Sequence, residues 1–135
     1  GYMGGHGTFP TYTNYTTHNN FSETIRLQYN ASALSFGDIM DMFWTFASDP
    51  TVAQPDPAYQ LRVFYVDEKQ RSVAVASKAA EQRKYKQPVL LDVVPAEEFV
   101  FWKAEEYHQN YFMKHGYTCE QPDAVAKLLA SLRGV

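Results

Sequence analysis

Apolar and polar residues alternate from Glu23 to Tyr29, and this alternation predicts a half-buried strand. Ile25 and Leu27 lie on the apolar side of the pattern, and Glu23 falls on the same side. A carboxylate on the buried side of a sheet is costly unless it is neutralised or hydrogen-bonded. Glu23 is therefore either a solvated residue at the start of the strand or a carboxyl group in an apolar pocket. In a pocket, burial would raise its pKa and keep it protonated near neutral pH.

The spacing of apolar residues elsewhere predicts helices over 35–47, 68–84, 104–114 and 122–133. Ser35 and Asp38 resemble a capping box at the start of the first helix. In the second helix, Val73, Ala76 and Ala80 are expected to form the inner stripe.

Two further segments are predicted to be strands, 59–66 and 89–94. The first is partly apolar on both faces, which is typical of a central strand, and Tyr59 shares a face with Leu61 and Val63. Residues 1–20 lack periodicity and are predicted to be loop. Strands that alternate with helices indicate an α/β or α+β fold, and 135 residues suit one domain.

Charge and cysteine content exclude several classes of function. The chain has 12 basic and 15 acidic residues, and the basic residues form no cluster, which argues against a nucleic-acid partner. No apolar run reaches the ~20 residues of a membrane-spanning helix. Scattered histidines and one cysteine predict no metal site and no disulfide framework, and no cofactor is expected. A single cysteine is also more typical of a reducing compartment, such as the cytosol or an organelle stroma or matrix.

Two features concern processing. The sequence begins at Gly1 without a leader, so we expect a trimmed segment whose upstream part is missing. Asn14, Asn20 and Asn30 each begin a glycosylation sequon. Such triplets matter only in a secreted chain, so we expect no sugar at them.

Six stretches, occurring in the family's order, resemble the peptide-methionine sulfoxide reductases that act on the S epimer. They are distributed along most of the chain and are Gly1-Tyr2-Met3-Gly4-Gly5-His6, Pro10-Thr11-Tyr12, Glu23 to Tyr29, Phe43-Trp44 with Asp49-Pro50-Thr51, Tyr59 to Tyr65, and Ala104-Glu105-Glu106-Tyr107-His108-Gln109-Asn110-Tyr111. The resemblance implies an α+β roll of ferredoxin-like type, here a single domain over 1–135 that lacks the first strand and helix.

The resemblance also implies a chemistry. In that family a cysteine thiolate attacks the sulfoxide sulfur, a glutamic acid protonates the departing oxygen, and two tyrosines hold that oxygen. A second cysteine resolves the sulfenic acid, and thioredoxin regenerates the thiols. Carried over to this sequence, Glu23 matches the acid and Tyr12 and Tyr59 match the tyrosines. Cys119 matches a resolving cysteine.

The sequence departs from the family's pattern in three places. The nucleophile's Gly-Cys-Phe-Trp motif is absent from these 135 residues. Asn20-Phe21-Ser22 stands where the family has Thr-Gly-His-Ala, and Pro57-Ala58-Tyr59-Gln60 stands where it has Gly-Thr-Gln-Tyr-Arg. These segments orient the acid in the family, so the differences are expected to loosen the site.

Three hypotheses remain open from the sequence. The chain is a non-catalytic accessory or interaction module, with another polypeptide covering the place of the missing strand and helix. Alternatively, it is part of an active thioredoxin-dependent reductase whose catalytic cysteine lies upstream of Gly1. Third, it binds oxidised methionine through Glu23, Tyr12 and Tyr59 without turnover.

Overall fold

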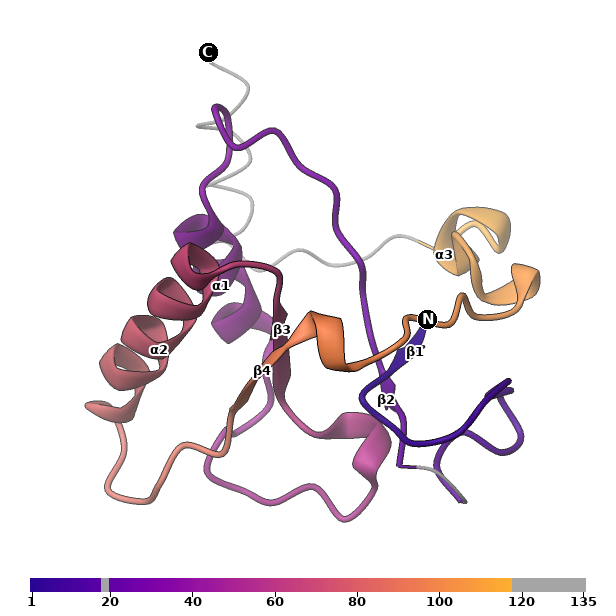
Figure 1. Cartoon of the computed structure of the whole chain (residues 1–135), viewed down its shortest axis with the longest axis horizontal. Coiled ribbons are helices and arrows are strands. Elements are labelled where there is room, and N and C mark those ends of the chain that lie inside the picture. The colour runs from indigo at the N-terminus through magenta and orange to yellow at the C-terminus, as the bar shows by residue number, and fades with distance from the viewer. Residues whose placement is uncertain (18–19, 118–135) are drawn as a thin grey trace. The chain divides into compact units, whose positions relative to one another are not determined.

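The computed structural model describes residues 1–17 and 20–117, which divide into two compact units (Figure 1). Of the described residues, the first unit contains 1–17, 20–27, 54–60 and 96–117, and the second contains 28–53 and 61–95. Each unit mixes helical segments with a two-stranded sheet, which confirms the α+β class. The helix predicted over 122–133 and Cys119 lie outside the described residues.

The second unit is built around a parallel strand pair. Strand β3 (Arg62–Tyr65) pairs with β4 (Asp92–Pro95), with Val63 opposite Val93. Parallel neighbours need a long crossover, and helix α2 (Glu68–Gln82) supplies it. Both strands are shorter than predicted. Among the described residues β3 pairs only with β4, so it is not a central strand there.

Helix α1 (Phe36–Phe46) confirms the helix predicted over 35–47. Ser35 accepts a hydrogen bond from the Asp38 backbone N–H at 3.1 Å, and Asp38 accepts one from the Ser35 backbone N–H at 2.8 Å. This reciprocal capping box uses two backbone donors that the helix start leaves free. Asp67 caps α2 in a similar way by accepting from the Gln70 N–H at 2.7 Å.

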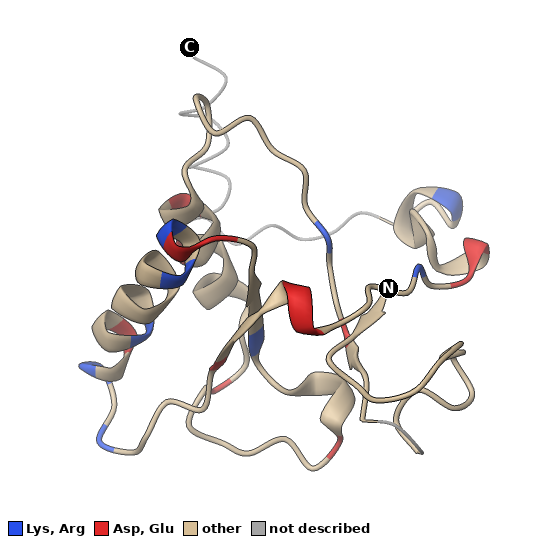
Figure 2. Ribbon diagram, viewed as in Figure 1, with Lys and Arg blue, Asp and Glu red and all other residues tan. Residues whose placement is uncertain are grey.

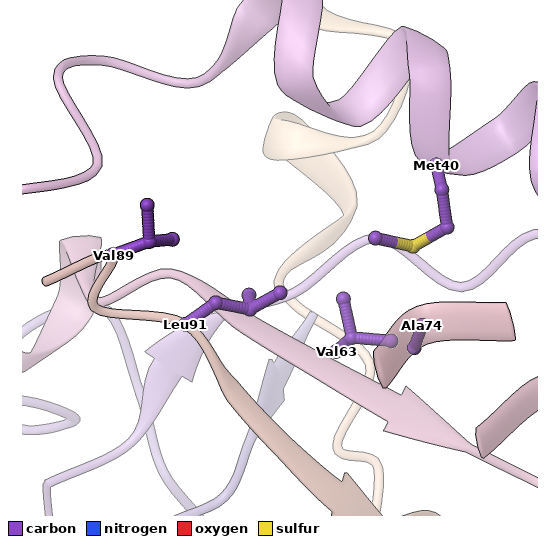
Figure 3. Packing of buried hydrophobic residues seen from close by; sticks show 5 residues of the cluster. All are labelled: Met40, Val63, Ala74, Val89 and Leu91. Atoms are coloured by element: carbon purple, nitrogen blue, oxygen red, sulfur yellow. The ribbon is translucent and has the colours of Figure 1, made fainter. Parts of the chain in front are cut away.

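The apolar core of the second unit lies between α1, α2 and the strand pair (Figure 3). Five buried residues form it, with Phe36, Phe43 and Trp44 packed around them: Met40, Val63, Ala74, Val89 and Leu91. Trp44 also donates its indole N–H to the Ser77 hydroxyl at 2.7 Å, which ties α1 to α2. The core is therefore a contact between helices and strands that are far apart in the sequence.

The buried stripe of α2 differs from the predicted one. Ala74 is fully buried, and Val73 packs beside it as predicted, whereas Ala76 and Ala80 are exposed. Alanine is equally compatible with either face of a helix, so its position carries little information about burial. Acidic and basic residues are interspersed along α2 (Figure 2).

The first unit contains little regular structure. Strands β1 (Tyr2–Met3) and β2 (Ser22–Glu23) pair antiparallel, and the 3₁₀ helix η1 (Pro57–Tyr59) packs against β2. Strand β1 falls in a segment predicted to be loop. The remaining 3₁₀ helices are η2 (Ala96–Glu98) and η3 (Glu106–His108).

The predictions for 23–29 and 104–114 are wrong in extent. Strand β2 ends at Glu23, and beyond it the apolar side chains of Ile25 and Leu27 are exposed. The second segment divides into η3 and the short helix α3 (Tyr111–Lys114). Asn110 separates them because its φ of 52° is left-handed and cannot continue a right-handed helix. Similarly, Tyr59 lies in η1 rather than in the strand predicted for it.

No helix among the described residues is long and apolar enough to cross a membrane. In the same part of the chain, no group of three or more His, Cys, Asp or Glu side chains is arranged to hold a metal ion.

Candidate functional site

A tyrosine–carboxylate pair marks the candidate site in the first unit. Tyr15 donates its hydroxyl to Glu23 Oε1 at 2.6 Å, a short hydrogen bond. Tyr15 is buried, and the turn that presents it is closed by its backbone N–H, which donates to the Thr11 carbonyl at 3.0 Å. Burial, followed by the hydrogen bond to Glu23, raises the pKa of the Tyr15 phenol.

Glu23 itself is exposed, so the possibility of a carboxyl group in an apolar pocket is not realised. The reason lies in the pairing of β2. Thr24 still exchanges backbone hydrogen bonds with Gly1, at 2.8 and 2.9 Å, but strand pairing within the described residues goes no further. Without a sheet beyond this point, the alternating side chains have no apolar layer to face.

A second tyrosine–carboxylate pair lies beside the first. Tyr2 of β1 donates its hydroxyl to Glu105 Oε2 at 2.6 Å, and the Tyr12 backbone N–H donates to Glu105 Oε1 at 2.9 Å. Burial, together with the bond to Glu105, raises the pKa of Tyr2. Burial would raise the pKa of Glu105, but the bonds from Tyr2 and Tyr12 outweigh it and the pKa is lowered.

Contacts between aromatic rings join the two tyrosine–carboxylate pairs. The Tyr2 and Tyr15 ring centroids are 4.8 Å apart, and those of Tyr12 and Tyr15 are 6.3 Å apart. The Tyr12 side chain is 54% exposed, which leaves it accessible to a ligand. Its ring also lies 5.0 Å from that of His108.

Tyr59 comes to the same region through η1. The Ser22 hydroxyl of β2 donates to the Pro57 carbonyl at 3.0 Å and holds η1 against the strand. Because η1 contains Tyr59 and packs on the strand that contains Glu23, Tyr59 belongs to the same part of the first unit as the Tyr15–Glu23 pair. The Tyr12 ring lies beside the Tyr15 ring of that pair.

Three residues of this cluster were not singled out from the sequence: Tyr2, Tyr15 and Glu105. Tyr2 and Glu105 lie within stretches that carry the family resemblance, so the motifs contained a signal for them. Tyr15 lies in a turn without periodicity, and nothing in its local sequence distinguishes it from neighbouring tyrosines.

Phenol O–H groups beside an exposed carboxyl can together bind an oxygen acceptor and transfer a proton to it.

Comparison with known proteins gives consistent results. Residues 1–131 match the sequence family described as peptide methionine sulfoxide reductase. Peptide methionine sulfoxide reductase MsrA of Methanosarcina acetivorans is 36% identical over 125 residues, which cover 87% of this chain and 65% of the relative. MsrA of Clostridium acetobutylicum is 32% identical over 135 residues, covering 94% of this chain and 81% of the relative.

The chain spans only part of its relatives. It covers 65% of the length of the M. acetivorans protein and 58% of the MsrA of Methanosarcina mazei. Among solved structures, reduced Mxr1 from Saccharomyces cerevisiae matches with a TM-score of 0.70 and 22% identity. That match covers 89% of this chain and 72% of the yeast chain, and it concerns the fold.

Proposed function

Because this chain belongs to the peptide methionine sulfoxide reductase family, we propose that its 135 residues form a module that is not catalytic by itself. The module serves as an accessory or interaction subunit of a larger assembly. One observation carries the proposal: the only cysteine is Cys119, and no Gly-Cys-Phe-Trp motif occurs in these residues. A positioned acid cannot reduce a sulfoxide unless a nucleophile attacks the sulfur.

The chemistry assigned to the site follows from its donors. In sulfoxide reduction by a thiol, the oxygen passes from the methionine sulfur to the thiol sulfur, giving methionine and a sulfenic acid. Tyr12 and Tyr59 would donate hydrogen bonds to the sulfoxide oxygen, and Glu23 would protonate it as the sulfur–oxygen bond breaks. The 2.6 Å bond from Tyr15 supports this role because it orients the Glu23 carboxyl group.

The partner we propose is a polypeptide strand from outside these 135 residues. Within the part of the chain that the structure describes, no strand lies between Glu23 and α1 (Figure 1). Ile25 and Leu27 in this segment are 84% and 58% exposed. The paired Gly1 and Thr24 backbones already form the end of an antiparallel ladder. A strand that continued this ladder would use the open hydrogen-bonding groups after Thr24 and cover the apolar side chains.

A second candidate function is an active, thioredoxin-dependent peptide-methionine (S)-S-oxide reductase whose cysteine lies on a segment before Gly1. The tyrosine cluster around Glu23 favours this alternative, because an oriented carboxyl group is useful for catalysis but not for a purely structural module. Under this alternative Cys119 would be the resolving cysteine. Thioredoxin would then regenerate the thiols.

An activity assay separates the two functions. We expect the 135-residue chain to show no thioredoxin-dependent reduction of a peptide containing methionine S-sulfoxide. Turnover by this chain that is lost in Cys119→Ser would contradict the proposal. Turnover by a longer natural form of the protein, with a cysteine before Gly1, would reject the accessory function and support the reductase.

A separate experiment tests the proposed partner strand. The isolated chain should self-associate at micromolar concentration because its open edge can pair with another copy. Ile25→Asp should weaken this association several-fold in sedimentation velocity, since it places a charge on the edge. Val66→Asp is the control, because Val66 is 72% exposed but distant in sequence from the edge. A monomeric chain that unfolds cooperatively would show that no covering strand is needed.

A further inference from the structure

Glu105 joins two parts of the first unit that are far apart in the sequence. Its Oε2 accepts from the Tyr2 hydroxyl in β1, and its Oε1 accepts from the backbone N–H of Tyr12. Both carboxylate oxygens are therefore used, at 2.6 and 2.9 Å. Neither donor is a charged side chain, so Glu105 acts here as a bridging acceptor rather than as half of an ion pair.

The neighbouring Glu106, in contrast to Glu105, forms ordinary ion pairs with lysines. Its carboxylate lies 3.0 Å from Lys103 and 3.7 Å from Lys114, and it is exposed. Exposed ion pairs of this kind contribute little to stability. Glu105, the residue before η3, and Glu106, the first residue of η3, thus have different surroundings, and only Glu105 contacts the tyrosine cluster.

The hydrogen bond between Glu105 and Tyr12 uses only the backbone N–H of Tyr12, so the Tyr12 hydroxyl is not engaged by it. Glu105 holds the backbone of this residue, while the phenol ring packs on His108 at 5.0 Å and on Tyr15 at 6.3 Å. The Nε2 atom of His108 is buried and has no hydrogen-bond partner among the described residues. The Tyr12 and His108 rings therefore meet in a tilted ring contact, with an angle of 47° between their planes, and the direction of the Tyr12 hydroxyl depends on how its backbone is held.

We propose that Glu105 is a positioning residue: by bridging Tyr2 of β1 and the backbone of Tyr12, it sets the Tyr12 hydroxyl beside the Tyr15–Glu23 pair, where a sulfoxide oxygen would bind. The proposal rests on the proposed function for the identity of the ligand. The placement of Tyr12 by Glu105 is a property of the protein alone and can be measured without a ligand.

NMR of the His108 ring protons measures that placement directly. The Tyr12 and Tyr107 rings lie 5.0 and 4.3 Å from the His108 ring, so their ring currents shift its proton signals. In the full 135-residue chain, Glu105→Ala should move these signals toward their positions in an unfolded chain, and Glu106→Ala should leave them in place. Glu105→Gln should largely preserve the signals, because an amide oxygen can still accept from the Tyr12 N–H. Unmoved His108 signals in Glu105→Ala would overturn the proposal.

Binding of a peptide with methionine S-sulfoxide then tests the consequence for the site. We expect Glu105→Ala to weaken binding about five- to tenfold, the loss of roughly one oriented hydrogen bond. In a Tyr12→Phe background the same substitution should have no further effect, because the hydroxyl it positions is gone. Equal weakening in both backgrounds would show a general structural role and contradict the proposal. If the unaltered chain binds no sulfoxide while the His108 signals respond as expected, the proposed ligand is wrong and the positioning by Glu105 stands.

Discussion

Glu23→Gln should slow methionine sulfoxide reduction by about 10²–10⁴-fold in any form of the protein that supplies a reactive thiol. Glutamine keeps the size of the side chain and can still accept the hydrogen bond that Tyr15 donates at 2.6 Å. It has no acidic proton to give to the departing oxygen. The measurement is single-turnover formation of methionine from a sulfoxide peptide, with the same form of the protein carrying Glu23 as the reference.

Two controls make this result specific to the acid. Glu106→Gln removes an exposed carboxylate of the same unit that does not contact the tyrosine cluster, and it should leave the rate unchanged. Glu23→Gln should also lower the pKa of Tyr15, because the bond to a charged Glu23 is one cause of its rise. An ultraviolet titration of the phenol above pH 10 detects this change. An unaltered reduction rate in Glu23→Gln would reject Glu23 as the acid.

Met40→Ala should lower the free energy of unfolding by about 2–5 kcal/mol. Met40 of α1 is 2% exposed and packs with Ala74 of α2 and Val63 of β3, as Figure 3 shows. Removing its side chain would leave a cavity where these three elements meet. The loss is a large share of a typical domain stability of 5–15 kcal/mol, so partial unfolding at 37 °C is expected.

Met113→Ala is the matched control for this experiment. Met113 is 82% exposed in α3, and its substitution should change stability by less than about 0.5 kcal/mol. Urea titrations of both variants give the comparison. Equal midpoints for the two would mean that the Met40 cluster is not the stabilising core of the second unit.

The helices that the sequence predicted correctly are those specified locally. The start of α1 depends on Ser35 and Asp38, three residues apart, so the motif and its hydrogen bonds are both local. The strand predicted from Glu23 to Tyr29 depends on a partner strand, which no local pattern can supply. A single left-handed residue, Asn110, was enough to break the helix predicted over 104–114. Asparagine is several-fold enriched in that conformation, but positive φ is uncommon for any residue other than glycine, so the sequence alone does not show which asparagine adopts it.

The candidate site was predicted through family resemblance more than through pattern. Motif matches predicted Tyr12, Glu23 and Tyr59 as site residues, and all three belong to the first unit. The alternation around Glu23 suggested possible burial, yet the side chain is exposed. The bonds made by Glu105 span 103 and 93 residues of sequence. Contacts at such separation are set by the tertiary fold, so a single sequence without a structure could not reveal them.

The bare edge at Ile25 and Leu27 also bears on how such a protein is maintained in a cell. A chain with uncovered apolar side chains beside open backbone groups is recognised by chaperones and proteases as unfinished. If the proposed covering strand belongs to a separate polypeptide, the steady-state amount of this chain would follow the supply of that polypeptide, and excess chain would be degraded rather than accumulate.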